Sequence, residues 1–102
     1  MIMSHSEKEL KRTRYDTYAD LIRVISHRGF CSLSRAARSA NLPVDRAKVT
    51  IQYLCDRGIL VEKEENEKKG YKTTARGFTY LELYKQIRTM VGAPESTTFG
   101  IF

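Results

Sequence analysis

The stretch PVDRAKVTIQYLCDRGIL, residues 43–60, predicts an amphipathic helix that leads directly into a strand. At about 100° per residue, Ala47, Ile51 and Leu54 fall on one helix face, and mainly polar side chains cover the opposite face. One face therefore belongs to a core, and the other is available to a partner. We expect this helix to occupy residues 44–57.

The residues on either side of this helix indicate how it is presented. Pro43 suits a helix start because its missing N–H has no intrahelical partner there, and Gly58 suits the left-handed residue that ends a helix. A short alanine-rich helix capped by Ser32 is expected over residues 32–40, and only a short turn containing Leu42 separates it from the next helix. Two helices joined so closely must cross sharply, as in a helix-turn-helix motif. An ordinary helical hairpin in a small core has the same spacing.

The segment before this pair predicts a further helix. Apolar residues recur at helical spacing from Tyr15 to His27, a start near Thr13 is favoured, and Gly29 ends the run. Phe30 and Cys31 then suggest a brief strand or a buried connection.

A β-hairpin is expected after the second helix of the pair. Residues 59–61 open a strand, and residues 71–73 form its partner after a turn that ends in Gly70. A hairpin in this position is typical of the wing of a winged helix. Its tip carries Lys68 and Lys69, which can follow a phosphate backbone, but the neighbouring glutamates are equally consistent with a merely solvated hairpin.

A last helix is expected over residues 74–91, and it is longer than the core of so small a domain requires. Phe78 and Leu81 are expected to pack on the domain. A second apolar face has the spacing of a coiled-coil seam and predicts dimerisation. The candidate dimerisation residues are Tyr80, Leu83, Tyr84, Ile87, Met90 and Val91. Packing of this face against the chain's own tail, residues 92–102, is the alternative.

Length and composition exclude several classes of protein. The 102 residues are expected to form a single domain, 1–102, and 18 Lys and Arg against 12 Asp and Glu give a net charge of +6, which favours polyanionic partners. Cys31 and Cys55 form no CxxC pair, and we expect free thiols, no metal and no cofactor. No catalytic constellation and no membrane-spanning run is apparent. We therefore expect a cytoplasmic, nucleoid-associated protein that is not an enzyme.

Four motifs give the chain a resemblance to a known family. They are Lys11-Arg12-Thr13-Arg14, Ala40-Asn41-Leu42, the segment from Tyr53-Leu54 to Gly58-Ile59-Leu60, and Tyr71 followed by Thr73-Thr74-Ala75-Arg76-Gly77-Phe78. Over residues 12–91 the chain resembles small archaeal winged helix-turn-helix proteins that bind DNA and dimerise through a C-terminal antiparallel coiled coil. Pro43 departs from the family's usual polar cap, and the tail beyond Gly92 is not part of the pattern.

The expected fold is mainly α with a small β-hairpin wing: a winged helix-turn-helix over residues 12–73, a coiled-coil helix over 74–91 and a tail over 92–102. The expected function is sequence-dependent binding of double-stranded DNA by a homodimer, as a transcription regulator with no identified small-molecule effector. The candidate DNA-binding residues are Arg35, Arg38, Arg46, Lys48, Val49, Gln52, Lys68 and Lys69. A largely non-specific architectural chromatin protein and a winged-helix module that docks another protein are the alternatives.

Overall fold

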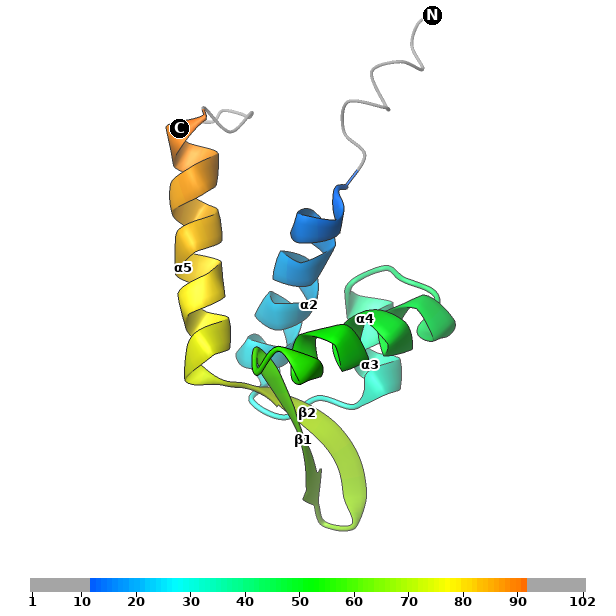
Figure 1. Ribbon diagram of the computed structural model, residues 1–102. Coiled ribbons are helices and arrows are strands. Elements are labelled where there is room, and N and C mark those ends of the chain that lie inside the picture. Colours follow the sequence, from blue (N-terminus) through cyan, green and yellow to red (C-terminus); the bar gives the residue numbers. More distant parts are fainter. Residues whose placement is uncertain (1–11, 92–102) are drawn as a thin grey trace, which may run out of the picture.

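The computed structural model describes residues 12–91, which fold into four helices and one two-stranded antiparallel hairpin. The elements are α2 (Arg14–Arg28), α3 (Leu33–Ser39), α4 (Val44–Asp56), β1 (Leu60–Glu65), β2 (Lys68–Thr73) and α5 (Ala75–Met90). In Figure 1, α2 and α5 stand beside one another, α4 runs across the lower part of α2, and the hairpin projects below the helices. The expected tail lies outside the described residues.

The core is built mainly by α2, α3 and α4. Thr13 caps α2 through a reciprocal capping box with Asp16, which confirms the expected helix start. The largest fully buried side chains include Leu21, Ile51 and Leu54, so the apolar face expected for residues 44–57 is indeed the core face. Because that face is occupied, the opposite face of α4 is left at the surface.

The helix-turn-helix geometry depends on the turn between α3 and α4. Asn41 adopts a left-handed conformation with φ of 60°, which asparagine tolerates better than most residues. The Leu42 N–H then donates to the carbonyl oxygen of Ala37 at 2.9 Å, and the Leu42 side chain is buried. Pro43 is the N-cap of α4 and makes no side-chain cap bond. The first helical residue is therefore Val44, one position after the proline.

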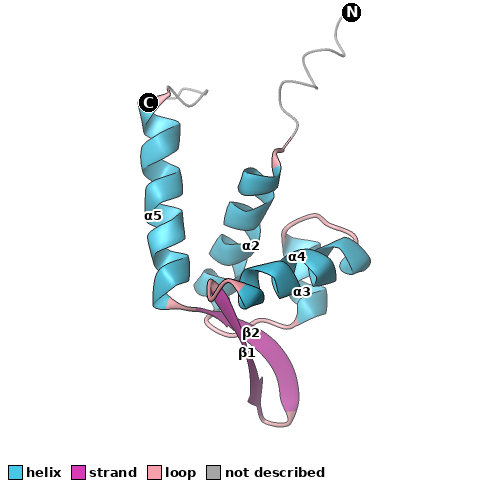
Figure 2. Cartoon of the chain, viewed as in Figure 1, coloured by secondary structure: helices cyan, strands magenta, loops and turns pink. Residues whose placement is uncertain are grey.

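The hairpin differs in register from the sequence prediction. Its connection is a two-residue turn, Asn66–Glu67, in which both residues have positive φ, as a type I′ turn requires. Gly70 is therefore a mid-strand residue, not the end of the turn. A Cβ on Gly70 would lie 2.5 Å from the Phe30 ring, so glycine is needed there for close packing. Figure 2 shows the two strands, joined by the turn, extending away from the helices.

A threonine and a glycine join α5 to the domain. The Thr74 hydroxyl caps α5 by accepting from the Gly77 N–H at 3.1 Å and donates to the carbonyl oxygen of Gly58 at 2.6 Å. A Cβ on Gly77 would lie 2.5 Å from the Ile59 carbonyl oxygen. The Thr-x-x-Gly motif therefore both starts α5 and sets its distance from the domain.

Candidate nucleic-acid interface

The outer face of α4 is the most accessible part of the helix-turn-helix. Asp45, Val49, Gln52 and Asp56 lie along its centre, and Val49 is 71% exposed. The Gln52 amide donates to the Asp56 carboxylate at 3.2 Å, so an incoming base must compete with that bond. This face also borders a shallow hollow of about 580 Å³.

The remaining expected contacts flank this face or lie on α3. All eight candidate DNA-binding side chains are exposed, and the cations on α3 and α4 make no ion pair within residues 12–91. Helix α4 itself is neutral, because Arg46 and Lys48 balance Asp45 and Asp56. Any excess positive charge at this surface therefore comes from the neighbouring elements.

Arg57 was missed by the sequence reasoning. As the C-cap residue of α4, it places its guanidinium 3.9 Å from the centroid of the Tyr53 ring, a close cation–π arrangement. Tyr53 is 38% exposed, so the stacked pair lies at the surface beside the outer face of α4. A four-residue spacing of Tyr and Arg on a predicted helix is the signal that would have found it.

The wing has two faces of different charge, because side chains alternate along a strand and directly paired residues share a face. We call the first the basic wing face: it carries Lys63, Lys68 and Lys72 with a single acid, Glu65. Lys72 pairs with Glu65 at 3.0 Å, whereas Lys63 and Lys68 have no ion-pair partner among the described residues. Lys63 is thus a second candidate contact that the sequence reasoning did not select.

The other side, the acidic wing face, carries Glu62, Glu64 and Lys69. Lys69 lies directly opposite Glu64 and 4.0 Å from the Glu62 carboxylate. The two lysines that the sequence placed together at the wing tip therefore lie in β2 on opposite faces, in unlike electrostatic surroundings.

Helix α5 is rotated relative to the expected arrangement. Tyr80 and Tyr84 pack toward α2: the Tyr80 hydroxyl donates to the Tyr15 carbonyl oxygen at 2.8 Å, and the Tyr84 hydroxyl donates to the Asp16 carboxylate. Phe78, expected to pack on the domain, is 53% exposed. Both expectations are corrected by the structure, because the two tyrosines occupy the inward face.

The apolar residues that remain outside form what we call the α5 stripe, namely Leu83, Ile87, Met90 and Val91. Ile87 is 59% exposed and Met90 is 83% exposed. These four of the six candidate dimerisation residues are exposed and available to a partner. Tyr80 and Tyr84 are not.

Tyrosines connect α4 to α5 through α2. Tyr18 stacks on Tyr53 with ring centroids 5.6 Å apart and meets the edge of Tyr80 at 6.4 Å, and Tyr80 stacks on Tyr84 at 6.2 Å. Burial, together with the neighbouring Tyr84 and Tyr18, raises the pKa of Tyr80 to about 12. The Tyr80 hydroxyl is therefore protonated at neutral pH and acts as a donor.

Two charged residues fix the N-terminal end of α2. Burial opposes ionisation of Asp16, but hydrogen bonds from Tyr84 and Thr13 and the charge of Arg88 lower its pKa below the usual value. Arg12 donates to the Ala40 carbonyl oxygen at 2.8 Å and pairs with an aspartate of α2. Arg12 therefore holds the helix-turn-helix turn and is not a free phosphate contact.

Within residues 12–91 no group of three or more His, Cys, Asp or Glu side chains could hold a metal ion. Both cysteines are free, and burial raises the pKa of the Cys31 and Cys55 thiols, which makes them less reactive. No helix between residues 12 and 91 is long and apolar enough to cross a membrane.

These features define a winged helix-turn-helix protein: residues 11–92 match the model of the winged helix-turn-helix family, and the chain belongs to that family. This class agrees with the expectation that the chain is not an enzyme.

Three solved structures show the same fold. Sso10a-2, a DNA-binding protein from Sulfolobus solfataricus, is 24% identical with a TM-score of 0.64, over 79% of this chain and 85% of that one. F93 from STIV, a winged-helix DNA-binding protein, is 20% identical with a TM-score of 0.62, over 81% and 98%. A MarR family transcriptional regulator from Silicibacter pomeroyi is 16% identical with a TM-score of 0.65, over 89% and 64%. No curated protein sequence matches the chain.

Proposed function

We propose that this protein binds duplex DNA as a homodimer and acts as a cytoplasmic, nucleoid-associated transcription regulator. The observation that carries the proposal is the exposed outer face of α4, held out by a fully occupied core face and flanked by a wing with one basic side. The similar folds of Sso10a-2 and F93, both described as DNA-binding, support it.

The proposal assigns base contacts to the outer face of α4. Gln52 can pair with adenine once its bond to Asp56 is broken, Lys48 can donate to guanine, and Val49 can meet a thymine methyl group. Arg46 on the flank joins these contacts. Because α4 is neutral, its side chains contribute discrimination between sequences more than overall attraction.

Phosphate contacts are assigned to cations outside that face. Arg35 and Arg38 on α3 are exposed and make no ion pair within the described chain. Lys68 and Lys63 supply the basic wing face, and Arg57 offers a guanidinium that is already held over the Tyr53 ring. Lys69, beside Glu62, contributes less.

The dimer is assigned to the α5 stripe. An exposed apolar row on a helix of 16 residues is costly to leave in water, and two such rows packed together remove it. The spacing of Leu83, Ile87 and Met90 is 4 and then 3, as in a coiled-coil seam. Two copies then present two α4 helices to two half-sites.

A second function, docking of another protein, is favoured by one observation. The exposed surface of α4 carries no net charge and includes Val44, Val49 and Tyr53, which are 47%, 71% and 38% exposed. An apolar, neutral surface of this kind also suits a protein partner. An architectural chromatin protein with little sequence preference remains the alternative within DNA binding.

One experiment separates these functions: titration of random and genomic duplexes at two salt concentrations. We expect salt-dependent binding in which Gln52→Ala relaxes discrimination between sequences and Arg38→Ala weakens all duplexes alike. Equal losses from both variants would remove α4 as the reader. Absence of binding at low salt would favour the protein-docking function, and binding without any preference the architectural one.

A further inference from the structure

Four tyrosines form what we call the tyrosine ladder, a continuous row of rings that runs from α4 through α2 to α5. Tyr53 of α4 stacks on Tyr18 of α2 with ring centroids 5.6 Å apart and an angle of 22° between the rings. Tyr18 also meets Tyr80 of α5 at 6.4 Å, and Tyr80 stacks on Tyr84 at 6.2 Å. Aromatic pairs at centroid separations of about 4.5–7 Å prefer offset-stacked or edge-to-face geometry, so these contacts are directional. Tyr18 is the member of the ladder whose ring contacts both α4 and α5.

Helix α5 is attached at its start to backbone groups that directly follow α4. The Thr74 hydroxyl donates to the Gly58 carbonyl oxygen at 2.6 Å, and Gly77 lies close to the Ile59 carbonyl oxygen. At about 1.5 Å per residue, the 16 residues of α5 extend about 24 Å from this attachment. An attachment at one end fixes where a helix begins but leaves its direction to contacts farther along.

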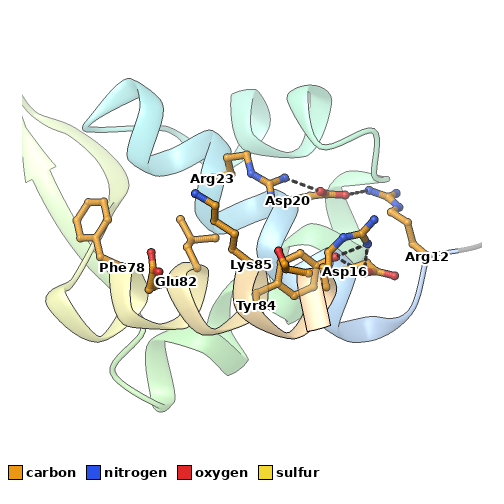
Figure 3. Close-up of a pocket in the computed structure, with 11 residues that line it drawn as sticks. Arg12, Asp16, Asp20, Arg23, Phe78, Glu82, Tyr84 and Lys85 are labelled. Atoms are coloured by element: carbon orange, nitrogen blue, oxygen red, sulfur yellow. Dashed lines mark hydrogen bonds and ion pairs between the residues drawn. The ribbon is translucent and has the colours of Figure 1, made fainter. Parts of the chain in front are cut away.

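The direction of α5 is fixed by tyrosines that contact α2. The Tyr80 hydroxyl donates to the Tyr15 carbonyl oxygen at 2.8 Å. Figure 3 shows Tyr84 of α5 against Asp16 of α2, where the tyrosine hydroxyl donates to the carboxylate. On one side of these contacts α2 and α5 border an open cleft of about 910 Å³. Packing across that side therefore does not hold α5, and the tyrosines are the contacts that orient it.

We propose that Tyr18 is a positioning residue for DNA recognition: by contacting Tyr53 and Tyr80 it fixes the direction of α4 relative to α5. This inference rests on the proposed function, in which α5 makes the dimer and α4 reads a half-site. Two-fold symmetry repeats any displacement of α4 in the second copy. A displacement of about 1.7 Å in each copy changes the separation of the two α4 helices by up to about 3.4 Å, the rise of one base pair. Tyr18 therefore determines which half-site spacing the dimer accepts.

The first test measures the arrangement of α4 and α5 in the full chain without DNA. Nitroxide labels are attached through Val49→Cys on α4 and Gln86→Cys on α5, both exposed positions, in a Cys55→Ser background; Cys31 is 1% exposed and stays unlabelled. Labelled chain is diluted into unlabelled chain, so that pulsed electron paramagnetic resonance reports distances within one copy. Tyr18→Leu should shift or broaden the distance distribution by about 1.7 Å or more, whereas Tyr18→Phe, which keeps the ring, should not. An unchanged distribution in a folded Tyr18→Leu chain would overturn the role of Tyr18.

The second test measures the accepted half-site spacing. Duplexes that the parent enriches from a random library define its preferred spacing. Affinity is then measured for that spacing, for spacings changed by one base pair and for a single half-site. The parent should bind a changed spacing about 10-fold more weakly. Tyr18→Leu should reduce this difference to about 2-fold while keeping the parent's affinity for the single half-site, and Tyr18→Phe should behave as the parent does.

The outcomes separate positioning from a purely structural role. A folded Tyr18→Leu dimer that keeps the parent's difference between spacings would contradict the proposal, and so would an equal loss for every duplex including the single half-site. If Tyr18→Leu does not fold, Tyr53→Leu breaks the same stack from the surface, where Tyr53 is 38% exposed, and the same results are expected of it. If the parent binds no duplex, the proposed function fails, and the label distances by themselves decide whether Tyr18 orients α4.

Discussion

The two wing lysines should contribute unequally to duplex binding. Lys68 lies on the basic wing face without an ion-pair partner among residues 12–91, whereas Lys69 lies 4.0 Å from Glu62 and opposite Glu64. A lysine that contacts a phosphate displaces counterions from the DNA through its positive charge. A lysine whose charge is already neutralised by a nearby glutamate displaces fewer of them. Lys68→Ala should therefore change the salt dependence, and Lys69→Ala should change it little.

The magnitude follows from the number of contacts. Each lost phosphate contact lowers the slope of log K against log salt by about 0.9. A dimer has two wings, so Lys68→Ala should lower the slope by about 1.8, which over a four-fold rise in salt is about a 12-fold difference in affinity. Fluorescence anisotropy of a labelled duplex between 50 and 200 mM salt is expected to resolve this, since these concentrations differ by about four-fold.

The controls test charge against side-chain volume. Lys68→Arg keeps the charge and should keep the parent's slope. An equal change of slope for Lys68→Ala and Lys69→Ala would refute the division of the wing into two faces, and no change for either would mean that the wing does not touch phosphate.

Three further predictions concern the dimer and the fold. Ile87→Glu, in the middle of the α5 stripe, should give a folded monomer by light scattering with much weaker duplex binding, whereas Gln86→Glu should remain dimeric. Gly77→Ala should lower the free energy of unfolding by about 1–3 kcal/mol in urea because its Cβ would lie 2.5 Å from the Ile59 carbonyl oxygen; an unchanged midpoint would contradict that contact. Because folding lowers the pKa of Asp16 from 3.8, its stabilising contribution is present above pH 3.8 and is lost as the pH falls through the folded value. Between pH 5 and pH 2, Asp16→Asn should therefore lose less thermal stability than the parent. The difference should be about the contribution of one carboxyl group whose pKa is lowered by folding.

Local signals in the sequence account for most of the secondary structure. Thr13, Ser32 and Thr74 each precede an apolar helical repeat, and all three are the observed N-caps. Each cap interacts with residues within one helical turn, so the helix start that it sets does not depend on tertiary packing. The hairpin was placed less well because the sequence offers Gly70 as an obvious turn residue, and the Phe30 ring that requires a glycine there is 40 positions away.

The sequence predicts the residue types of the candidate nucleic-acid interface but not their arrangement in space. Exposure of the α4 cations follows from helical periodicity, which is a local property. The separation of Lys68 from Lys69 follows from the position of both residues in β2 and not in the turn, because successive residues of a strand point to opposite faces. The strand register then decides which glutamate lies opposite each lysine. The role of Arg12 at the helix-turn-helix turn could not be predicted from the sequence, because it depends on carbonyl groups 28 and 29 residues away.

The orientation of α5 shows why periodicity alone could not select its free face. A helix that is apolar around much of its circumference can be rotated about its axis with little change in pattern. Gly77 removes this freedom, because its contact with the Ile59 carbonyl oxygen forces that side of the helix against the domain. Residues three, four and seven positions after Gly77 lie on the same face of α5 as Gly77. Tyr80 and Tyr84 are therefore packed against α2, and Ile87 is left exposed. A glycine early in an otherwise good helix-forming sequence was therefore the signal for the proposed dimer surface, since it marks the side of α5 that packs on the domain and cannot face a partner.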